Sequence, residues 1–404
     1  MSIAAGAFES RLPPGSAALF AEFGAQAEAP PNGDPTIGSF HAAAQESYAT
    51  NQGFRNLINR YVSLETVDNA SYQANKVFKA AHSLYMPFKV RTATGYPYGY
   101  DELTWMHDIT ANLSDARSPQ SIEMRANLRR PLQTSRDKRA IVLSFLAGAL
   151  SQEREFEGGL TVHDYGSSSN HVLKSLALRH PNYAKIVDAQ GHYDKSATRI
   201  FNMFSGFYKS GRGLMRGYGI EAQPPTNNPR AQNWLKSCSL DPSQLDPPRE
   251  QVAGVKEFND EDTYELLTEA RPPQVHTIRG NFLNLSPEHH HKLASNKADL
   301  AFFSHVLSQN APHISTISKN TMPLLKRRGM IVVNEYAEVP PDNPQTLNIL
   351  DDWYASKWLC QTFVLSKASP ELGFLPIIRW ESSHCEVGQI VEENISHIAP
   401  DLAA

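Results

Sequence analysis

The sequence has few cysteines, no long apolar run and little net charge. Its three cysteines, Cys238, Cys360 and Cys385, are far apart and odd in number, so neither a disulfide framework nor a zinc site is expected, and a reducing compartment fits best. No run approaches the roughly 18 apolar residues of a transmembrane helix, and the opening residues lack the pattern of a signal peptide. The net charge of −4 creates no basic field that would draw the chain to nucleic acid or to a membrane. We therefore expect a cytoplasmic protein without a membrane partner.

Composition and periodicity divide the 404 residues into three parts. Residues 1–38 are rich in alanine, glycine and proline and are expected to form a flexible leader. Apolar side chains recur at helical spacing over residues 39–150, which predicts an all-helical region. Residues 151–404 alternate apolar strands with helices, as is typical of an α/β domain. The proline-rich stretch 209–270 is longer than a crossover between strands needs, so we interpret it as an insertion.

The most informative stretch lies near the start of the predicted α/β domain. Residues 160–165 read as a buried strand, and the small residues that follow predict a tight turn. Residues 171–179 have apolar positions at helical spacing, and Pro181 would end that helix. A second strand is predicted over 183–188. The order strand, turn, helix and strand is typical of a parallel sheet that is covered by helices.

The turn resembles a known cofactor-binding motif. The segment Asp164-Tyr165-Gly166-Ser167-Ser168-Ser169-Asn170 is similar to the first motif of class I S-adenosylmethionine (SAM) dependent methyltransferases, in which an acid, a glycine, a small residue and a second glycine follow an apolar strand. Asn170 stands where the family has its last glycine. Gly280-Asn281-Phe282 and the segment 326–336 resemble the family's motifs after the third strand and around the fifth. The resemblance implies a seven-stranded, mostly parallel, Rossmann-like sheet with an added N-terminal helical region.

The resemblance also implies S-adenosyl-L-methionine as cofactor and assigns residues to it. Gly166 and Ser168 would cradle the methionine part, Asp188 would hold the ribose hydroxyls, and Asn281 with Phe282 would meet the adenine. The complete expected set is Asp164, Gly166, Ser168, Asn170, Asp188, Asn281, Phe282 and Ser304.

Two further residues are candidates for catalysis. Ligands of an open parallel sheet bind outside the carboxyl ends of its strands, and His305 and Glu335 lie at the carboxyl ends of two predicted strands. A histidine can accept a proton near neutral pH, so His305 is the first candidate for the base that activates a hydroxyl acceptor, and Glu335 is the second. Both could instead be structural residues.

The expected reaction is transfer of a methyl group to an oxygen or nitrogen atom of a small molecule. The amino-group methyltransferase signature Asn/Asp-Pro-Pro-Tyr is absent after the fourth predicted strand, where Ser304 begins Ser-His-Val-Leu. This absence disfavours nucleic-acid bases and glutamine as acceptors. Residues 39–150 would cap the substrate side or form a homodimer, as the resemblance implies.

Alternative functions stay open at this level. The chain could be an enzyme of the same fold that binds SAM but transfers no methyl group, as a cyclase does. It could also be a methyltransferase-like scaffold without catalytic activity. A nicotinamide oxidoreductase is disfavoured by the missing G-x-G-x-x-G pattern.

The run His289–His291 does not predict a metal site, because neighbouring residues of a helix point in different directions. The basic stretch 125–139 reads as a solvated helix face, with phosphate binding as its alternative.

Overall fold

The computed structural model describes most of the chain and divides it into two compact units. The described residues are 12–63, 69–85, 101–130, 139–150, 159–179, 184–188, 190–205, 214–222, 224, 228–240, 260–306, 314–336, 360–381, 385, 387–391 and 394–395. The helical unit comprises Met1–Thr134 and Pro225–Glu265, and the α/β unit comprises Ser135–Pro224 and Leu266–Ala404. The chain therefore leaves the helical unit, returns to it once, and leaves it again.

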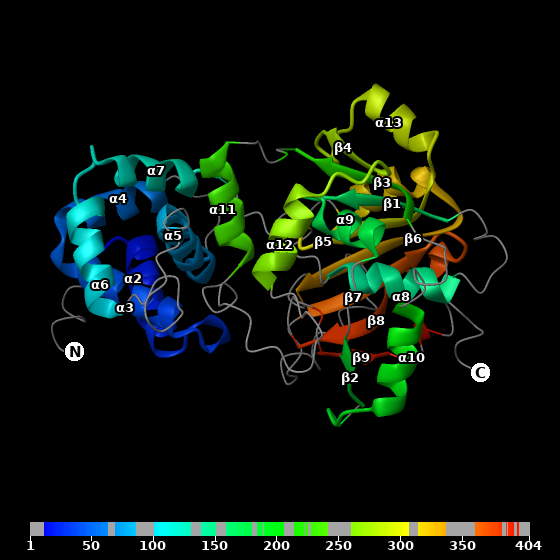
Figure 1. Ribbon diagram of the computed structural model, residues 1–404, viewed down its shortest axis with the longest axis horizontal. Helices are drawn as coiled ribbons and strands as arrows, with labels where there is room; N and C mark the ends of the chain where they lie inside the picture. Colours follow the sequence, from blue (N-terminus) through cyan, green and yellow to red (C-terminus); the bar gives the residue numbers. More distant parts are fainter. Residues whose placement is uncertain are drawn as a thin grey trace. The chain divides into compact units, whose positions relative to one another are not determined.

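The helical unit is built from helices whose starts are marked in the sequence. Its elements are α2 (Pro14–Glu28), α3 (Pro35–Thr50), α4 (Gln52–Val62), α5 (Ala70–Tyr85), α6 (Glu102–Asp108), the π-helical η3 (Ile109–Leu113), α7 (Pro119–Leu128) and α11 (Pro229–Ser239) (Figure 1). The Asp34 side chain accepts the Thr36 N–H at 2.9 Å and so caps α3, which begins at Pro35. Ser118 caps α7 in the same way, ahead of Pro119.

The core of the helical unit is aromatic and includes residues that were predicted to be flexible. Phe20 and Phe23 of α2 are buried with Phe40 of α3 and Phe78 of α5. The flexible leader predicted over residues 1–38 therefore differs from the structure from Pro14 onward, because α2 has an apolar face that the other helices cover. Residues 1–11 lie outside the described residues.

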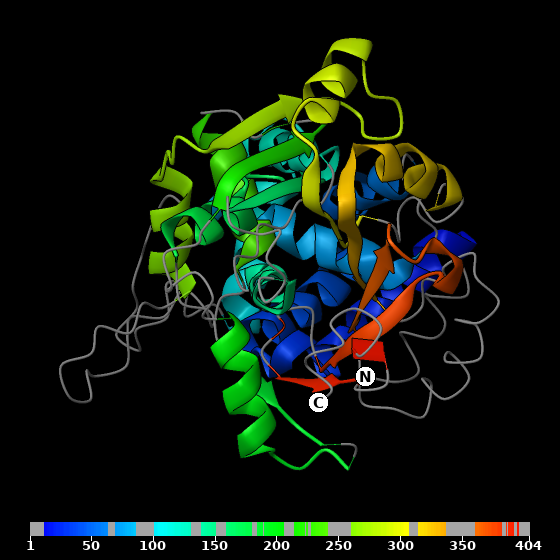
Figure 2. The same ribbon diagram turned by 90° about the vertical axis from the view of Figure 1, so that its right-hand side faces the viewer.

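The α/β unit contains a nine-stranded sheet, where the sequence predicted seven strands. Its strands are β1 (Leu160–Tyr165), β2 (Lys185–Ile186), β3 (Leu214–Glu221), β4 (Val275–Arg279), β5 (Ala298–Ser304), β6 (Leu325–Tyr336), β7 (Cys360–Ser366), β8 (Leu375–Trp380) and β9 (Val387–Ile390). Their order is β2-β9-β8-β7-β6-β5-β1-β3-β4. Figure 2 shows the sheet with the yellow-green strands at the top and the red C-terminal strands at the bottom. The two-residue β2 and the short β9 account for the strands beyond seven.

The central strands are parallel, as predicted. Strands β4, β3, β1, β5 and β6 all run in one direction. Strands β7 and β8 then form antiparallel pairs, β6 with β7 and β7 with β8, so the sheet is mostly but not entirely parallel. All carboxyl ends of the five parallel strands thus lie along one edge, where ligands of such sheets bind.

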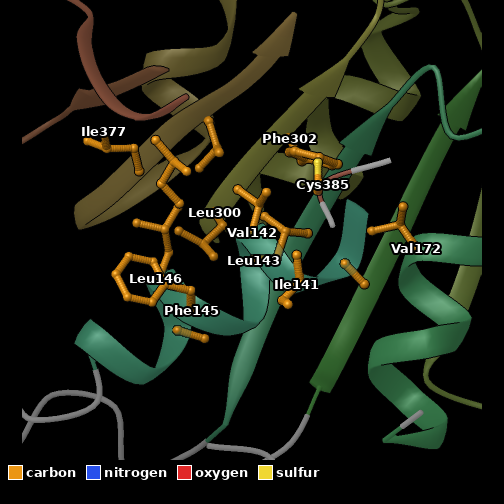
Figure 3. Packing of buried hydrophobic residues seen from close by; sticks show 14 of the residues in the cluster. Ile141, Val142, Leu143, Phe145, Leu146, Val172, Leu300, Phe302, Ile377 and Cys385 are labelled. Carbon is orange, nitrogen blue, oxygen red and sulfur yellow. The ribbon is translucent and has the colours of Figure 1, made fainter. Parts of the chain in front are cut away.

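Helices cover both faces of this sheet. On one face, Val162, Leu300 and Phe302 pack with α8 (Ala140–Leu150), α9 (His171–Leu178) and α10 (Lys195–Ser205) (Figure 3). On the other, Tyr165 and Phe303 pack with α13 (Pro287–Ala294) and α14 (Ile314–Thr321). Successive strand residues alternate between the two cores. Within the described part of the chain, no helix is both long and apolar enough to span a membrane.

Two segments lie elsewhere than the sequence predicted. The strand expected over 183–188 is β2, which pairs only with β9 at the far edge of the sheet. One of the two strands that pair with β1 is β3, which falls inside the stretch 209–270 that was interpreted as an insertion. The same stretch also supplies α11, whose Trp234 and Cys238 are buried in the helical unit. Parts of that stretch, including 241–259, lie outside the described residues.

Candidate active site

The carboxyl end of β1 carries a buried acid, Asp164, which is 3% exposed. Alternation along the strand puts it on the same face as Val162, which packs with α8. Burial and the nearby Glu221 carboxylate raise the pKa of Asp164 to about 7, and the Arg139 guanidinium opposes this shift. The carboxyl group therefore changes its charge near neutral pH.

The turn after β1 has an unusual backbone. Gly166, Ser168 and Asn170 have positive φ angles of 77°, 48° and 60°, a region that favours glycine and tolerates asparagine. The Gly166 N–H donates to the Ile220 carbonyl at 2.8 Å. A Cβ atom at Gly166 would lie 2.6 Å from Val306 Cγ1, so only glycine fits there without a shift. The turn therefore lies in close contact with the chain that follows β5.

Glu221 lies at the carboxyl end of β3, directly beside this turn. Its Oε2 atom accepts the Ser168 N–H at 3.0 Å, and the residue is 9% exposed. Glu221 is not predicted from the sequence, because Gly217 and Gly219 weaken the strand pattern. The available signal was an acid that directly follows the apolar Ile220.

Asp188 does not lie near this turn. It follows β2, and the strands β9, β8, β7, β6 and β5 separate β2 from β1. Its Oδ1 atom accepts the backbone N–H groups of Gln190 and His192 at 3.0 and 2.8 Å. Asp188 therefore stabilises a local turn, and the strand predicted over 183–188 does not pair with β1.

Asn170 replaces the last glycine of the motif and has a structural role in the turn. Its Nδ2 atom donates to Thr277 Oγ1 of β4 at 2.8 Å. Its side chain also lies against Gly219, where any Cβ atom would clash with Asn170 Oδ1. Asn170 thus joins the turn after β1 to β3 and β4. The left-handed conformation at this position is kept without glycine.

Asn281 and Phe282 follow β4, as the sequence predicted. Asn281 is exposed, and its Oδ1 atom accepts the Leu283 N–H at 3.0 Å. The Phe282 ring centroid lies 6.2 Å from that of Tyr165 and 5.9 Å from that of Phe303. The apolar ring therefore packs over the ends of β1 and β5, and the amide lies at the surface.

Two serine hydroxyls near the turn have no partner among the described residues. They are Ser167 Oγ, in the turn itself, and Ser304 Oγ, at the end of β5. Because Tyr165 pairs with Phe303 across β1 and β5, Ser304 lies just beyond the end of β1. A buried hydroxyl without a partner costs free energy, so both atoms fit a polar ligand that would bond them.

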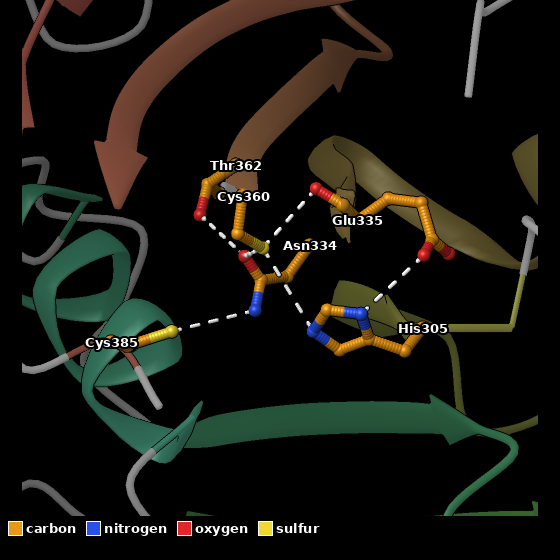
Figure 4. A network of polar contacts seen from close by, with 6 residues as sticks. All are labelled: His305, Asn334, Glu335, Cys360, Thr362 and Cys385. Atoms are coloured by element: carbon orange, nitrogen blue, oxygen red, sulfur yellow. Dashed lines mark hydrogen bonds and ion pairs between the residues drawn. The ribbon is translucent and has the colours of Figure 1, made fainter. Parts of the chain in front are cut away.

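His305 and Glu335 are brought together by the sheet (Figure 4). His305 follows β5 and Glu335 lies in β6, and the His305 N–H donates to the Asn334 carbonyl at 2.9 Å. The side chains then meet, with His305 Nδ1 3.4 Å from Glu335 Oε1 and side-chain exposures of 8% and 2%. His305 has a φ of +53°, a strained conformation for histidine that is typical of functional sites.

Cysteine and amide groups complete this network. Cys360 Sγ lies 3.8 Å from His305 Nε2 and donates to the Glu335 carbonyl at 3.1 Å. The Asn334 amide contacts Cys360 Sγ through Oδ1 and Cys385 Sγ through Nδ2, both at 3.4 Å. The imidazole is therefore held between a carboxylate and a thiol (Figure 4).

The order thiol, imidazole and carboxylate is also that of a cysteine nucleophile with its base. Cys360 is fully buried, and burial together with Cys385 raises its pKa well above the ordinary thiol value, although Arg139 lowers it. A nucleophilic cysteine needs the opposite environment, one that favours the thiolate. Cys360 is therefore a packing and hydrogen-bonding neighbour of His305.

The turn after β1 and the network around His305 lie at the same edge of the sheet. Val306, next to His305, contacts Gly166 closely. The Arg139 guanidinium acts electrostatically on both Asp164 and Cys360. A ligand held by the turn would thus have the imidazole nearby.

Comparison with known proteins gives no family by sequence. No family model matches the chain, and no curated protein matches it.

Within the described residues, no group of three or more histidine, cysteine, aspartate or glutamate side chains could hold a metal ion.

Solved structures with partial similarity include proteins described as methyltransferases. A protein of Listeria monocytogenes described as "a putative class I S-adenosylmethionine-dependent methyltransferase" is 11% identical, with 89% of this chain and 97% of that chain covered and a TM-score of 0.28. The Haloferax volcanii complex of the Trm112 methyltransferase activator with "the putative methyltransferase" is 14% identical, with 49% of this chain and 55% of that chain covered and a TM-score of 0.23. YjhP of E. coli is 14% identical, with 50% of this chain and 58% of that chain covered and a TM-score of 0.21.

The matches to the Haloferax and E. coli structures span little more than half of those chains. TM-scores this low do not establish a common fold, and the geometry of the site therefore carries the functional proposal.

Proposed function

We propose that this chain is a SAM-dependent methyltransferase that acts on an oxygen or nitrogen atom of a small molecule. The observation that carries the proposal is the His305–Glu335 pair, with 3.4 Å between Nδ1 and Oε1. It lies at the carboxyl ends of two parallel strands, next to the left-handed turn after β1. That edge is where ligands of open α/β sheets bind.

The residues around the turn fit the cofactor. Gly166 shapes the turn, with Val306 filling the space beside it, and the hydroxyls of Ser167 and Ser304 could donate to a carboxylate or accept from an ammonium group. Glu221, in place of Asp188, would accept bonds from the ribose hydroxyls. Phe282 would offer an apolar surface to the adenine ring.

Asp164 and Asn281 have supporting roles in this proposal. When ionised, Asp164 would complement the positive charge of the cofactor. Asn281 Oδ1, which accepts the Leu283 N–H in this structure, would accept a hydrogen bond from the adenine amine. Bound SAM would supply an electrophilic methyl group on a sulfonium.

His305 would remove the proton of the acceptor group. Glu335 Oε1 lies 3.4 Å from His305 Nδ1, so the carboxylate would keep Nδ1 protonated, and Nε2, which lies 3.8 Å from Cys360 Sγ, would take the proton of the acceptor. The same carboxylate stabilises the imidazolium that forms. The neighbouring Cys360 thiol, kept neutral by its raised pKa, adds no charge that would compete with Glu335.

The first test measures SAM binding and turnover in the full chain. We expect SAM to bind by calorimetry, and we expect a panel of phenols, catechols and amines to release S-adenosylhomocysteine. His305→Ala should lower turnover by about 10²- to 10⁴-fold with little change in SAM affinity, because general-base catalysis contributes about that factor. His192→Ala serves as the control, since His192 lies near β2 with 81% of its side chain exposed.

The outcomes separate this proposal from its rivals. SAM binding without release of S-adenosylhomocysteine by any acceptor would favour an inactive scaffold or a cyclase-like enzyme. Full turnover in His305→Ala would show that His305 is not the base. The capping or dimerisation role of residues 39–150 stays a prediction.

A further inference from the structure

The helical unit has a cavity of about 170 Å³ between α4, α5 and α7. Four of the side chains that line it are cationic. The described lining residues are Leu57, Arg60, Tyr61, Lys76, Arg125, Leu128 and Arg129. None of these is acidic, although the whole chain has a net charge of −4. Positive charge is therefore concentrated around this cavity.

Lys76 gives the cavity a buried cation. The residue is 4% exposed, and its ammonium lies 5.3 Å from the ring centroid of Tyr61 and 5.7 Å from that of Tyr72. Lysine is seldom buried to this extent without stabilising interactions. Cation–π contacts with these two tyrosines contribute to holding the charge in the interior.

Helix ends explain some of these cations but not their convergence. Arg60 and Arg125 lie in the last turns of α4 and α7, and Arg129 is the C-cap of α7, positions where the helix dipole favours positive charge. Lys76 lies in the interior of α5, where that effect does not apply. Arg125 is also fixed in place, because its Nη2 atom donates to the Ala116 carbonyl at 2.6 Å.

We propose that this cavity binds a small molecule that carries a phosphate or diphosphate group. Three guanidinium groups and one ammonium match a multiply charged anion, since guanidinium can bind two phosphate oxygens at once. The volume is below the roughly 300 to 1,000 Å³ of drug-sized pockets, so the anionic group would fill most of it. Leu57 and Leu128 would contact an apolar part of the ligand.

The proposal goes beyond methyl transfer and does not depend on it. A phosphate of a nucleic-acid backbone offers similar chemistry to that of a small molecule. The depth of Lys76, at 4% exposure, favours a free small molecule, because a phosphate within a polymer would have to enter the cavity with its neighbours attached. A binding experiment can distinguish the two sources.

The test is calorimetric titration of pyrophosphate into the full chain. We expect sub-millimolar binding, weakened about tenfold or more by Arg60→Gln or Arg129→Gln, since hydrogen bonds between charged groups contribute about that much. Both residues are exposed, so these variants should fold. Lys76→Met should weaken binding further, and its melting temperature shows whether it folds.

Arg130→Gln is the matched control. Arg130 is the next residue along the chain and donates to Asn127 Oδ1 at 2.7 Å, but it does not line the cavity. The variant should bind pyrophosphate as the wild type does, and SAM affinity should be unchanged in all variants. Three results would overturn the proposal: no pyrophosphate binding, equal weakening by Arg130→Gln, or binding of a single-stranded oligonucleotide but not of pyrophosphate.

Discussion

Asp164 is the residue whose protonation should link stability to pH. Its pKa is raised from 3.8 to about 7, first by burial and then by Glu221. The folded state therefore binds the proton more tightly than the unfolded state does. This contribution to stability is fully present below the unfolded pKa, and it is lost as pH rises through about 7.

Asp164→Asn should remove this dependence. Relative to the wild type, the variant should gain stability between pH 4 and pH 8, by at most about 4 kcal/mol for a shift of roughly three pKa units. Urea unfolding at several pH values measures the difference. Glu221→Gln should reduce the wild-type slope, because it removes the carboxylate that raises the pKa of Asp164. A pH-independent difference between Asp164→Asn and the wild type would contradict this account.

Single residues also explain where the motif departs from the pattern of the family that it resembles. Asn170 keeps the left-handed backbone that a glycine would supply, and it bonds Thr277 of β4. Gly166 cannot be replaced as simply, because a Cβ atom there would contact Val306 too closely. The departure at Asn170 thus leaves the shape of the turn intact.

At the scale of secondary-structure elements, the choice between β2 and β3 decides the cofactor proposal. The carboxyl end of β3 lies beside the turn after β1, with Glu221 Oε2 3.0 Å from the Ser168 N atom. The end of β2 lies at the far edge of the sheet. The acids at the two strand ends, Asp188 and Glu221, therefore have different surroundings.

A pair of conservative variants tests this assignment. Glu221→Gln should weaken SAM binding by about tenfold or more, since it removes a charged hydrogen-bond acceptor. Asp188→Asn should leave SAM affinity unchanged, because Asp188 bonds its own turn. Calorimetry on both proteins at one pH gives the comparison. The reverse pattern would return the ribose role to Asp188 and remove Glu221 from the site.

At the scale of the whole molecule, the chain has separate cores. One core is formed by α2 to α7 with α11, and the others lie on the two faces of the sheet. The helical and α/β units can therefore unfold in separate steps, and a two-state description need not hold.

Differential scanning calorimetry should then show two transitions. SAM should raise the temperature of one and pyrophosphate that of the other, since a ligand stabilises the unit that binds it, by about 2.7 kcal/mol at 100 times its Kd. Lys76→Met should reduce the effect of pyrophosphate and keep that of SAM. A single transition that both ligands raise equally would contradict independent units.

The sequence by itself determined the local features of this protein. The apolar pattern predicted the buried strand ending at Tyr165, the helix from His171 and a strand ending near Ser304, and the family resemblance implied the strand within residues 326–336. These features depend on neighbouring residues and on which side chains face a core. The positions of His305 and Glu335 after or near strand ends followed from the same pattern.

Tertiary structure alone decided which strands are neighbours. Nothing local distinguishes β2, a short strand after a helix, from the strand that pairs with β1, and the glycines of β3 hid a central strand within an apparent insertion. Strand pairing depends on residues distant in sequence, as with Leu160 beside Leu214. Such distant contacts decide three features of the structure. They place Glu221 at the turn, bring His305 into contact with Glu335, and form the basic cavity around Lys76.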